Sequence, residues 1–381
     1  MVERNSKIES VCRIFETINS TGTRLKTFDL AVARFYPKTD LQELWSKTQK
    51  KYSILDCDNF KVDSERILQV LFLVVATDKG KSTSKYIEPT RGNFLKLEPQ
   101  EIDKEWERSS EALAKTYEFA REQGARPETL PRHSLLVSLA AVRSLIFRDH
   151  GVDPWRKDEN YDFIRRWYFS KVMQANKRAQ SSNYQVSQDF KVLLEYARMG
   201  QRPEIPTVSL DAEKLLTLKP SDVLYKSLQN IFATTIRQDL LSGNAVNTKS
   251  PLHDHHIFPE NAAKRHGLDK TMLNSICNRV PMLASSNGYL GEGYPEDYLK
   301  KILDRARKES MLRDFKRRMR DCLIPGDPED PQWLDSFSIN QFEEFCRKRA
   351  ELIISRVHEI VGDSLQVNAA SDDESMEGDD D

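Results

Sequence analysis

The sequence has few cysteines, and none of them form a Cys-x-x-Cys pair. Five cysteines are scattered along 381 residues. An odd, scattered set argues against a disulfide framework, and the missing pairs argue against a structural zinc site. We therefore expect a reduced, intracellular protein, cytoplasmic or, in a eukaryote, nuclear.

Long hydrophobic runs are also missing. The longest, residues 67–76 (ILQVLFLVVA), is about half of the ~20 residues that a helix needs to cross a bilayer. The N-terminus, MVERNSKIES, is charged and polar, unlike a signal peptide. No membrane partner is expected. With 31% charged and 39% hydrophobic residues, the chain has the composition of a globular protein with two or three domains.

The charge is unevenly distributed. The net charge is −1, but the last eleven residues, SDDESMEGDDD, hold seven acids and no base. Without them the chain has 58 basic and 52 acidic residues (59 − 7), a net charge of +6. We expect this tail to be disordered. It would either compete with a polyanion for a basic groove or only keep the chain soluble.

Strand patterns are rare, and helical periodicity dominates residues 1–240. Apolar spacing predicts helices at residues 11–19, 25–36, 60–78, 101–123, 133–150, 161–179, 186–200 and 221–241. A polar turn at Gly22 separates the first two, and Thr27 is a candidate N-cap. The predicted fold is mainly α: a helical array followed by a small domain with two short strands. The predicted domains are residues 1–55, 56–240 and 241–365, followed by a tail at 366–381.

Histidines are scarce but concentrated after this array. The stretch HDHHIFPEN, residues 253–261, holds three of the chain's seven histidines. Short strands are expected at 255–258 and 279–283. On a strand, the adjacent His255 and His256 would point to opposite faces, which disfavours one closed metal site. An open site fits better, with one imidazole on a metal and its neighbour facing water or substrate. His253 and His266 are expected to be supporting or surface residues.

Two asparagines follow, just before the second predicted strand and at the start of the next helix. Asn278 lies just before the second strand, and Asn287 lies where the next helix begins. An asparagine oxygen is a hard ligand suited to Mg²⁺ or Mn²⁺. The order histidine, strand, asparagine, strand, asparagine, helix is typical of a ββα-metal finger nuclease.

The motifs HHIFP, NRVPMLASSN and YPEDYL resemble the HNH (His-Me finger) nucleases. More specifically, the chain resembles the GmrSD family of modification-dependent (type IV) restriction endonucleases. The segments IFETINSTGTRLKTFDLAVA, IRRWYFSKVMQANKRAQSSNYQVSQDF and NQFEEFCRKRAELIISRVHEIVG also resemble that family, in family order, so the likeness covers most of residues 10–362. The family usually begins with a nucleotide-binding domain bearing Asp-Gly-x-Gln-Arg, whereas this chain has no Asp-Gly dipeptide. The expectation is that this chain starts after that region.

The resemblance implies a metal-dependent DNA endonuclease that restricts foreign or modified DNA. It implies His256 as the general base, His255 and Asn287 as ligands of one Mg²⁺ or Mn²⁺ ion, and Asn278 as the brace that orients His256. A separate subunit supplying the nucleotide-binding domain and a homodimer are further expected partners.

A basic segment follows the histidines. Residues 300–320 carry ten bases and three acids, which favours phosphate contact over a merely solvated helix face. The expected DNA-binding residues are Lys300, Lys301, Arg305, Arg307, Lys308 and Arg317. Two alternatives stay open: a non-catalytic or partner-dependent module that binds nucleic acid or protein, and an RNA target.

Overall fold

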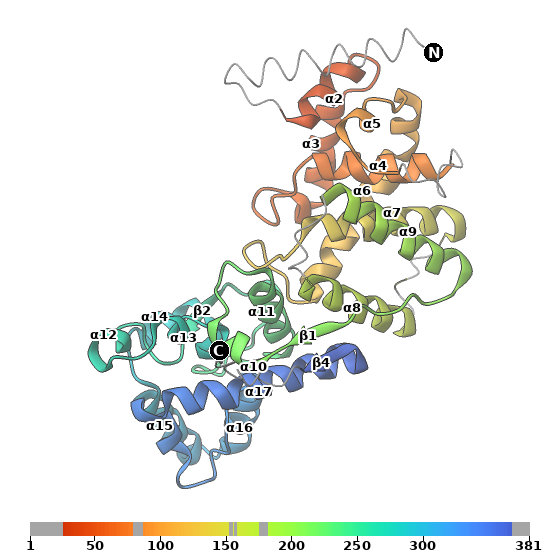
Figure 1. Cartoon of the computed structure of the whole chain (residues 1–381). Helices are drawn as coiled ribbons and strands as arrows, with labels where there is room; N and C mark the ends of the chain where they lie inside the picture. The colour runs from red at the N-terminus through yellow and green to blue at the C-terminus, as the bar shows by residue number, and fades with distance from the viewer. Residues whose placement is uncertain (1–25, 79–86, 152–154, 156–157, 175–181, 368–381) are drawn as a thin grey trace, which may run out of the picture. The chain divides into compact units, whose positions relative to one another are not determined.

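The computed structural model describes residues 26–78, 87–151, 155, 158–174 and 182–367 (Figure 1). The predicted helix at 11–19, the turn at Gly22 and the acidic tail lie outside these residues. Within them the chain is mainly helical, with four short strands, and the prediction of a mainly α fold is confirmed. None of the described helices is both long and apolar enough to cross a membrane.

The described residues divide into two compact units. The first takes in those up to residue 204 except 122–125 and 165–174, and the second takes in these two segments and everything from 205 onward. The second unit therefore begins its main segment upstream of residue 241. The predicted domain boundaries stay a prediction.

In its described part, the first unit contains helices and no strand. They are α2 (Thr27–Phe35), α3 (Leu41–Lys51), η1 (Ser53–Leu55), α4 (Glu65–Asp78), α5 (Arg91–Phe94), α6 (Pro99–Glu122), α7 (His133–His150), the start of α8 (Asp158–Met173) and α9 (Ser182–Met199). The central helix is α7, which packs against α4 and α9. Leu136, Leu139 and Ala140 of α7 are fully or almost fully buried, so removal of apolar surface from water stabilises this unit.

The prediction that Thr27 caps its helix is wrong. Lys26 is the N-cap residue of α2, and Thr27 is the first helical residue. The Asp29 carboxylate accepts a hydrogen bond from the Lys26 backbone N–H at 2.9 Å. An acid in the first turn also interacts favourably with the helix dipole, so a carboxylate inside the helix replaces the expected hydroxyl before it.

The second unit combines short helices with two two-stranded sheets. Its elements are β1 (Val208–Leu210), α10 (Ala212–Thr217), α11 (Val223–Thr235), β2 (Leu252–His256), α12 (Ala262–His266), α13 (Lys270–Leu273), η4 (Ile276–Asn278), β3 (Arg279–Leu283), α14 (Ala284–Leu290), α15 (Pro295–Lys308), α16 (Leu312–Asp321), η5 (Trp333–Phe337), η6 (Ile339–Gln341), α17 (Phe342–Val361), η7 (Gly362–Ser364) and β4 (Leu365–Val367). Strand β1 pairs in parallel with β4, and β2 pairs antiparallel with β3. Helix α17 forms much of the core and contacts α10 and η4.

The first predicted strand is displaced. It was expected at 255–258, but β2 ends at His256. Ile257 and Phe258 follow the strand and are fully buried in the core. The Phe258 ring lies edge-on to Phe342 and Phe345 of α17, with centroids 5.2 Å apart in each pair. The second strand, β3, has the predicted bounds.

Candidate functional site

Three histidines lie on strand β2, which pairs with β3 ahead of helix α14. Strands β2 and β3 pair from Leu252 with Leu283 to His256 with Arg279. Helix α14 follows β3 directly and contacts both strands. Successive side chains alternate between the faces of a strand. His253 and His255 therefore share one face of β2, while Asp254 and His256 share the other.

His255 meets Asn287 on the first face. His255 is buried, with 3% of its surface exposed. Its Nδ1 lies 2.7 Å from Asn287 Oδ1. Burial lowers the pKa of His255, which favours the neutral imidazole that a metal ion requires. His255 Nε2 is buried with no hydrogen-bond partner among the described residues. The structure thus brings together the two residues predicted to bind metal.

His256 meets a different asparagine on the opposite face. Its Nε2 lies 2.9 Å from Asn274 Oδ1. The same oxygen accepts a hydrogen bond from Arg279 Nη2, while Asn274 Nδ2 donates to the Lys270 carbonyl. These contacts identify Oδ1 as the acceptor, so His256 Nε2 must be the donor. In the neutral ring the lone pair then lies on Nδ1.

The charge state of His256 suits a base. Burial, followed by the nearby Arg279 guanidinium, lowers the pKa of His256 below its usual value. Both causes disfavour the imidazolium form. A neutral ring whose Nδ1 has no hydrogen-bond partner among the described residues can accept a proton from water.

Asn278 is fully buried and bonds only to backbone groups among the described contacts. Its Oδ1 accepts from the Phe258 N–H at 2.8 Å, and its Nδ2 donates to the carbonyls of Phe258 and Leu273 at 2.9 and 2.8 Å. The Asn278 carbonyl also accepts from the Ile257 N–H at 2.9 Å. The side chain therefore joins the turn after His256 to the end of α13. Its predicted role, the orientation of the catalytic base His256, stays a prediction.

Asp254 anchors the strand. Its carboxylate accepts from the Tyr225 hydroxyl at 2.5 Å and lies 3.6 Å from Arg279 Nη1, which also donates to the Asp254 carbonyl. Burial raises the pKa of this carboxyl, and Arg279 opposes that shift. Asp254 thereby fastens β2 to α11 and β3.

A buried acid that was not predicted from the sequence holds α14 in place. Asp239 accepts from the Leu283 N–H at 2.8 Å and from the Ser286 hydroxyl at 2.6 Å. Arg318 of α16 donates to the backbone carbonyl of Asp239. Since α14 carries Asn287, these contacts set where that amide lies. The sequence signal was weak, because Asp239 sits in a connector 44 residues before its partner Leu283.

The predicted DNA-binding residues are all exposed, on α15 and α16. Lys301 and Arg305 line a cavity of about 470 Å³ together with Tyr289 of α14. Arg317 donates to Asp314 and Gln238. The predicted cations therefore extend from the neighbourhood of α14 along two helices.

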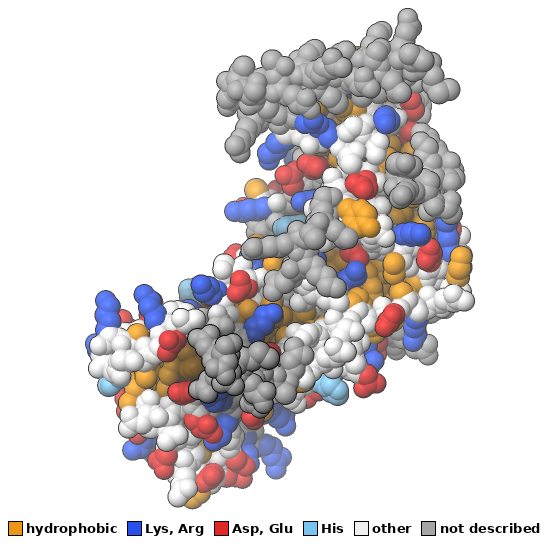
Figure 2. Space-filling model, viewed as in Figure 1, with side chains coloured by type: hydrophobic (Ala, Val, Ile, Leu, Met, Phe, Trp, Pro, Cys, Tyr) orange, Lys and Arg blue, Asp and Glu red, His pale blue; other side chains and the backbone are white. Residues whose placement is uncertain are grey.

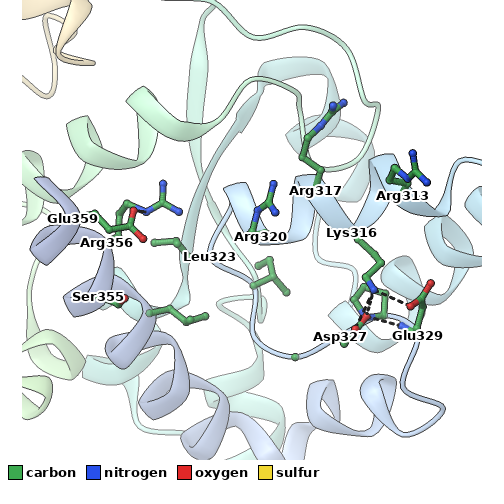
Figure 3. A pocket seen from close by; sticks show the side chains of 14 residues that line it. Arg313, Lys316, Arg317, Arg320, Leu323, Asp327, Glu329, Ser355, Arg356 and Glu359 are labelled. Carbon is green, nitrogen blue, oxygen red and sulfur yellow. Dashed lines mark hydrogen bonds and ion pairs between the residues drawn. The ribbon is translucent and has the colours of Figure 1, made fainter.

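Two further arginines of α16 were missed. Arg313, Arg317 and Arg320 are spaced by four and three residues, which puts them on one side of a helix. Figure 3 shows them projecting from that side, along a pocket of about 850 Å³, whereas Lys316 turns to Asp327 and Glu329. The spacing itself was the available signal. On the face shown in Figure 2, basic and acidic side chains are interspersed, without one continuous basic patch.

His266 follows the 253–261 stretch and belongs to helix α12. It ends this helix, is exposed, and contacts the Tyr294 hydroxyl through Nε2 at 3.1 Å. It shares no described contact with His255 or His256.

No family model matches the chain. A search of curated proteins finds similarity to the uncharacterized protein MJ0686 of Methanocaldococcus jannaschii, with 23% identity over 383 aligned positions. The alignment covers 94% of this chain and 63% of that relative. The chain thus spans less than two thirds of the relative's length.

Proposed function

We propose that this chain is a metal-dependent nuclease of the His-Me finger type, which hydrolyses phosphodiester bonds in DNA. The observation that supports it best is the placement of two adjacent histidines on opposite faces of β2, each held by its own asparagine. One imidazole is buried beside an amide oxygen, and the other offers a lone pair at a half-buried position. Such a pair can divide metal binding and proton transfer between neighbours.

His256 acts as the general base in this proposal. Its Nδ1 takes a proton from a water molecule, which attacks the scissile phosphorus in line with the leaving 3′ oxygen. Asn274 holds Nε2–H, so the ring presents Nδ1 in a single tautomer. Asn278 fixes the turn that follows His256 and thereby limits movement of the ring.

His255 and Asn287 would hold a divalent ion, Mg²⁺ or Mn²⁺. Their ligand atoms share a hydrogen bond of 2.7 Å, in which His255 Nδ1–H donates to Asn287 Oδ1. An ion would replace this hydrogen bond, with the ring proton moving to Nε2, and the lowered pKa of His255 keeps the ring neutral. When bound, the ion stabilises negative charge on the phosphate and on the leaving oxygen. Asp239 positions Asn287 for this task by holding the start of α14.

Phosphate contacts are assigned to exposed cations of α15 and α16. We include Arg313 and Arg320 beside the predicted Arg317, because the three share one helix side. Changing all three to glutamine should lower the slope of log affinity against log salt by about 2–3, at ~0.9 per phosphate contact. Lys348→Gln is the control, since it removes an exposed cation of α17, outside α15 and α16.

The GmrSD resemblance extends the proposal to restriction of foreign DNA with modified, sugar-bearing cytosine. The same resemblance makes a subunit with a nucleotide-binding domain a candidate partner. One finger of this kind cuts one strand, so a double-strand break would need two sites, as a homodimer provides.

The test is plasmid nicking by the full chain. Mg²⁺, Mn²⁺ and EDTA would be compared on plain DNA, glucosylated-cytosine DNA and RNA, with wild type and His256→Ala. Loss of a general base typically costs about 10²–10⁴ in rate. The control His266→Ala removes an exposed histidine of the same unit and should cut at the wild-type rate.

Metal-dependent nicking that His256→Ala abolishes and His266→Ala retains would establish the nuclease. Salt-dependent binding without cutting, by a chain shown to be folded, would overturn autonomous catalysis and favour the binding-module alternative. Equal nicking by both variants would remove His256 as the base.

A further inference from the structure

A second imidazole points at the same amide as His255. His253 and His255 are two residues apart on β2 and share a face. The Asn287 amide lies between them, with Oδ1 2.7 Å from His255 Nδ1 and Nδ2 3.3 Å from His253 Nδ1. Two imidazoles and one amide oxygen are therefore gathered on one side of the strand.

The amide also determines the tautomer of His253. Asn287 Nδ2 can only donate, so His253 Nδ1 must accept and carry the lone pair. His253 is exposed, which leaves its ring free to turn by a small amount toward an ion beside Asn287. In this contact Nδ1 is an acceptor, as the ligating nitrogen of a metal-bound imidazole must be.

His255 alone is a costly ligand. Binding through Nδ1 places its proton on Nε2, which is buried without a partner among the described residues. A buried N–H without an acceptor is unfavourable. His253 carries no such penalty, because its ligating nitrogen is already unprotonated and its ring is exposed.

We propose that His253 is a third protein ligand of the ion held by His255 and Asn287. The inference rests on the proposed function and sharpens it, because a second imidazole changes which ion the site prefers. Imidazole binds Mn²⁺, Co²⁺, Ni²⁺ and Zn²⁺ more readily than Mg²⁺, whose preferred ligands are oxygens. The site is thus selective for a transition ion, and three protein ligands leave positions for water and a phosphate oxygen.

The test is titration of the full chain with Co²⁺, followed by its visible absorption and by calorimetry. The variants are His253→Ala, His255→Ala and the control His266→Ala, each checked for folding by circular dichroism. His253→Ala should weaken Co²⁺ binding at least as much as loss of an outer supporting residue, ~10- to 100-fold, and should alter the absorption band. His255→Ala should abolish binding, and His266→Ala should match wild type. A large excess of Mg²⁺ should not displace Co²⁺.

The outcomes separate this inference from the proposed function. If His255→Ala abolishes Co²⁺ binding while His253→Ala leaves affinity and spectrum unchanged, His253 is not a ligand and the nuclease proposal stands. Ready displacement of Co²⁺ by equimolar Mg²⁺ overturns the ion preference. If folded wild-type chain binds no Co²⁺ at this site, both the inference and the metal-dependent mechanism fail.

Discussion

Replacement of Asn278 by alanine tests whether this side chain braces the turn after His256. The change leaves three backbone groups without their partner: the N–H and C=O of Phe258 and the C=O of Leu273. Each orphaned buried group costs about 1–3 kcal/mol. We expect about 3–5 kcal/mol in total, toward the lower part of the sum, because a water molecule can enter the space left by the amide.

The loss should be seen locally. The chain has two compact units, so one denaturant transition need not report on both. Hydrogen exchange of the Phe258 amide, whose proton is donated to Asn278 Oδ1, is the direct measurement. Exchange should accelerate strongly in Asn278→Ala, by about 10²-fold or more at 1.4 kcal/mol per tenfold.

Two variants control the measurement. Asn278→Asp keeps an acceptor for the Phe258 N–H but loses both donor contacts. Its destabilisation should therefore come from the unpaired carbonyls of Phe258 and Leu273. His256→Ala removes a half-buried ring with one described bond and should change stability by about 1 kcal/mol or less. If Asn278→Ala exchanges and unfolds like wild type, the bracing argument is wrong.

Three other predictions concern His256, Cys277 and Arg349. Because burial and the Arg279 charge lower the pKa of His256, its neutral, active form should persist below pH 6.5. Arg279→Gln should raise that pKa and move the acid limb of the single-turnover pH–rate profile to higher pH; an unmoved limb would contradict the assignment. Burial raises the pKa of Cys277 to about 12, so maleimide at pH 8 should modify the exposed Cys57 and spare Cys277 in native protein, as peptide mass spectrometry would show. Arg349 is fully buried and donates to three backbone carbonyls, so Arg349→Met should destabilise the second unit by about 3–5 kcal/mol, and an unchanged urea midpoint would refute this.

The helices could largely be predicted because their signal is local. The apolar spacing of residues 133–150 predicted a helix with the bounds of α7. The helix predicted at 221–241 ends early, at Thr235. Beyond that end, the Asp239 carboxylate accepts hydrogen bonds from the Leu283 N–H and the Ser286 hydroxyl. These partners are distant in sequence, so no local pattern predicts the contact.

The contacts between side chains in the site could not all be predicted in this way. Residue order predicted His255, His256 and Asn287 as site residues, but it did not predict Asn274. It lies at the end of α13, and only the pairing of His256 with Arg279 brings it to the imidazole. Register is set by burial of one strand face and by the core contacts of the loop, and Phe258 supplies such a contact through α17.

A two-residue motif can hold two chemistries only if something separates them, and here strand alternation does so. His255 is buried beside Asn287, whereas His256 is half-buried beside Asn274 and Arg279. Burial disfavours protonation of both rings, yet the first presents Nδ1 to an amide oxygen and the second has Nε2–H held by one. A one-residue slip of β2 against β3 would exchange these faces and separate each ring from its amide. The second imidazole of the metal face, His253, follows from the same alternation, so register, more than the identity of any single histidine, determines what this site can do.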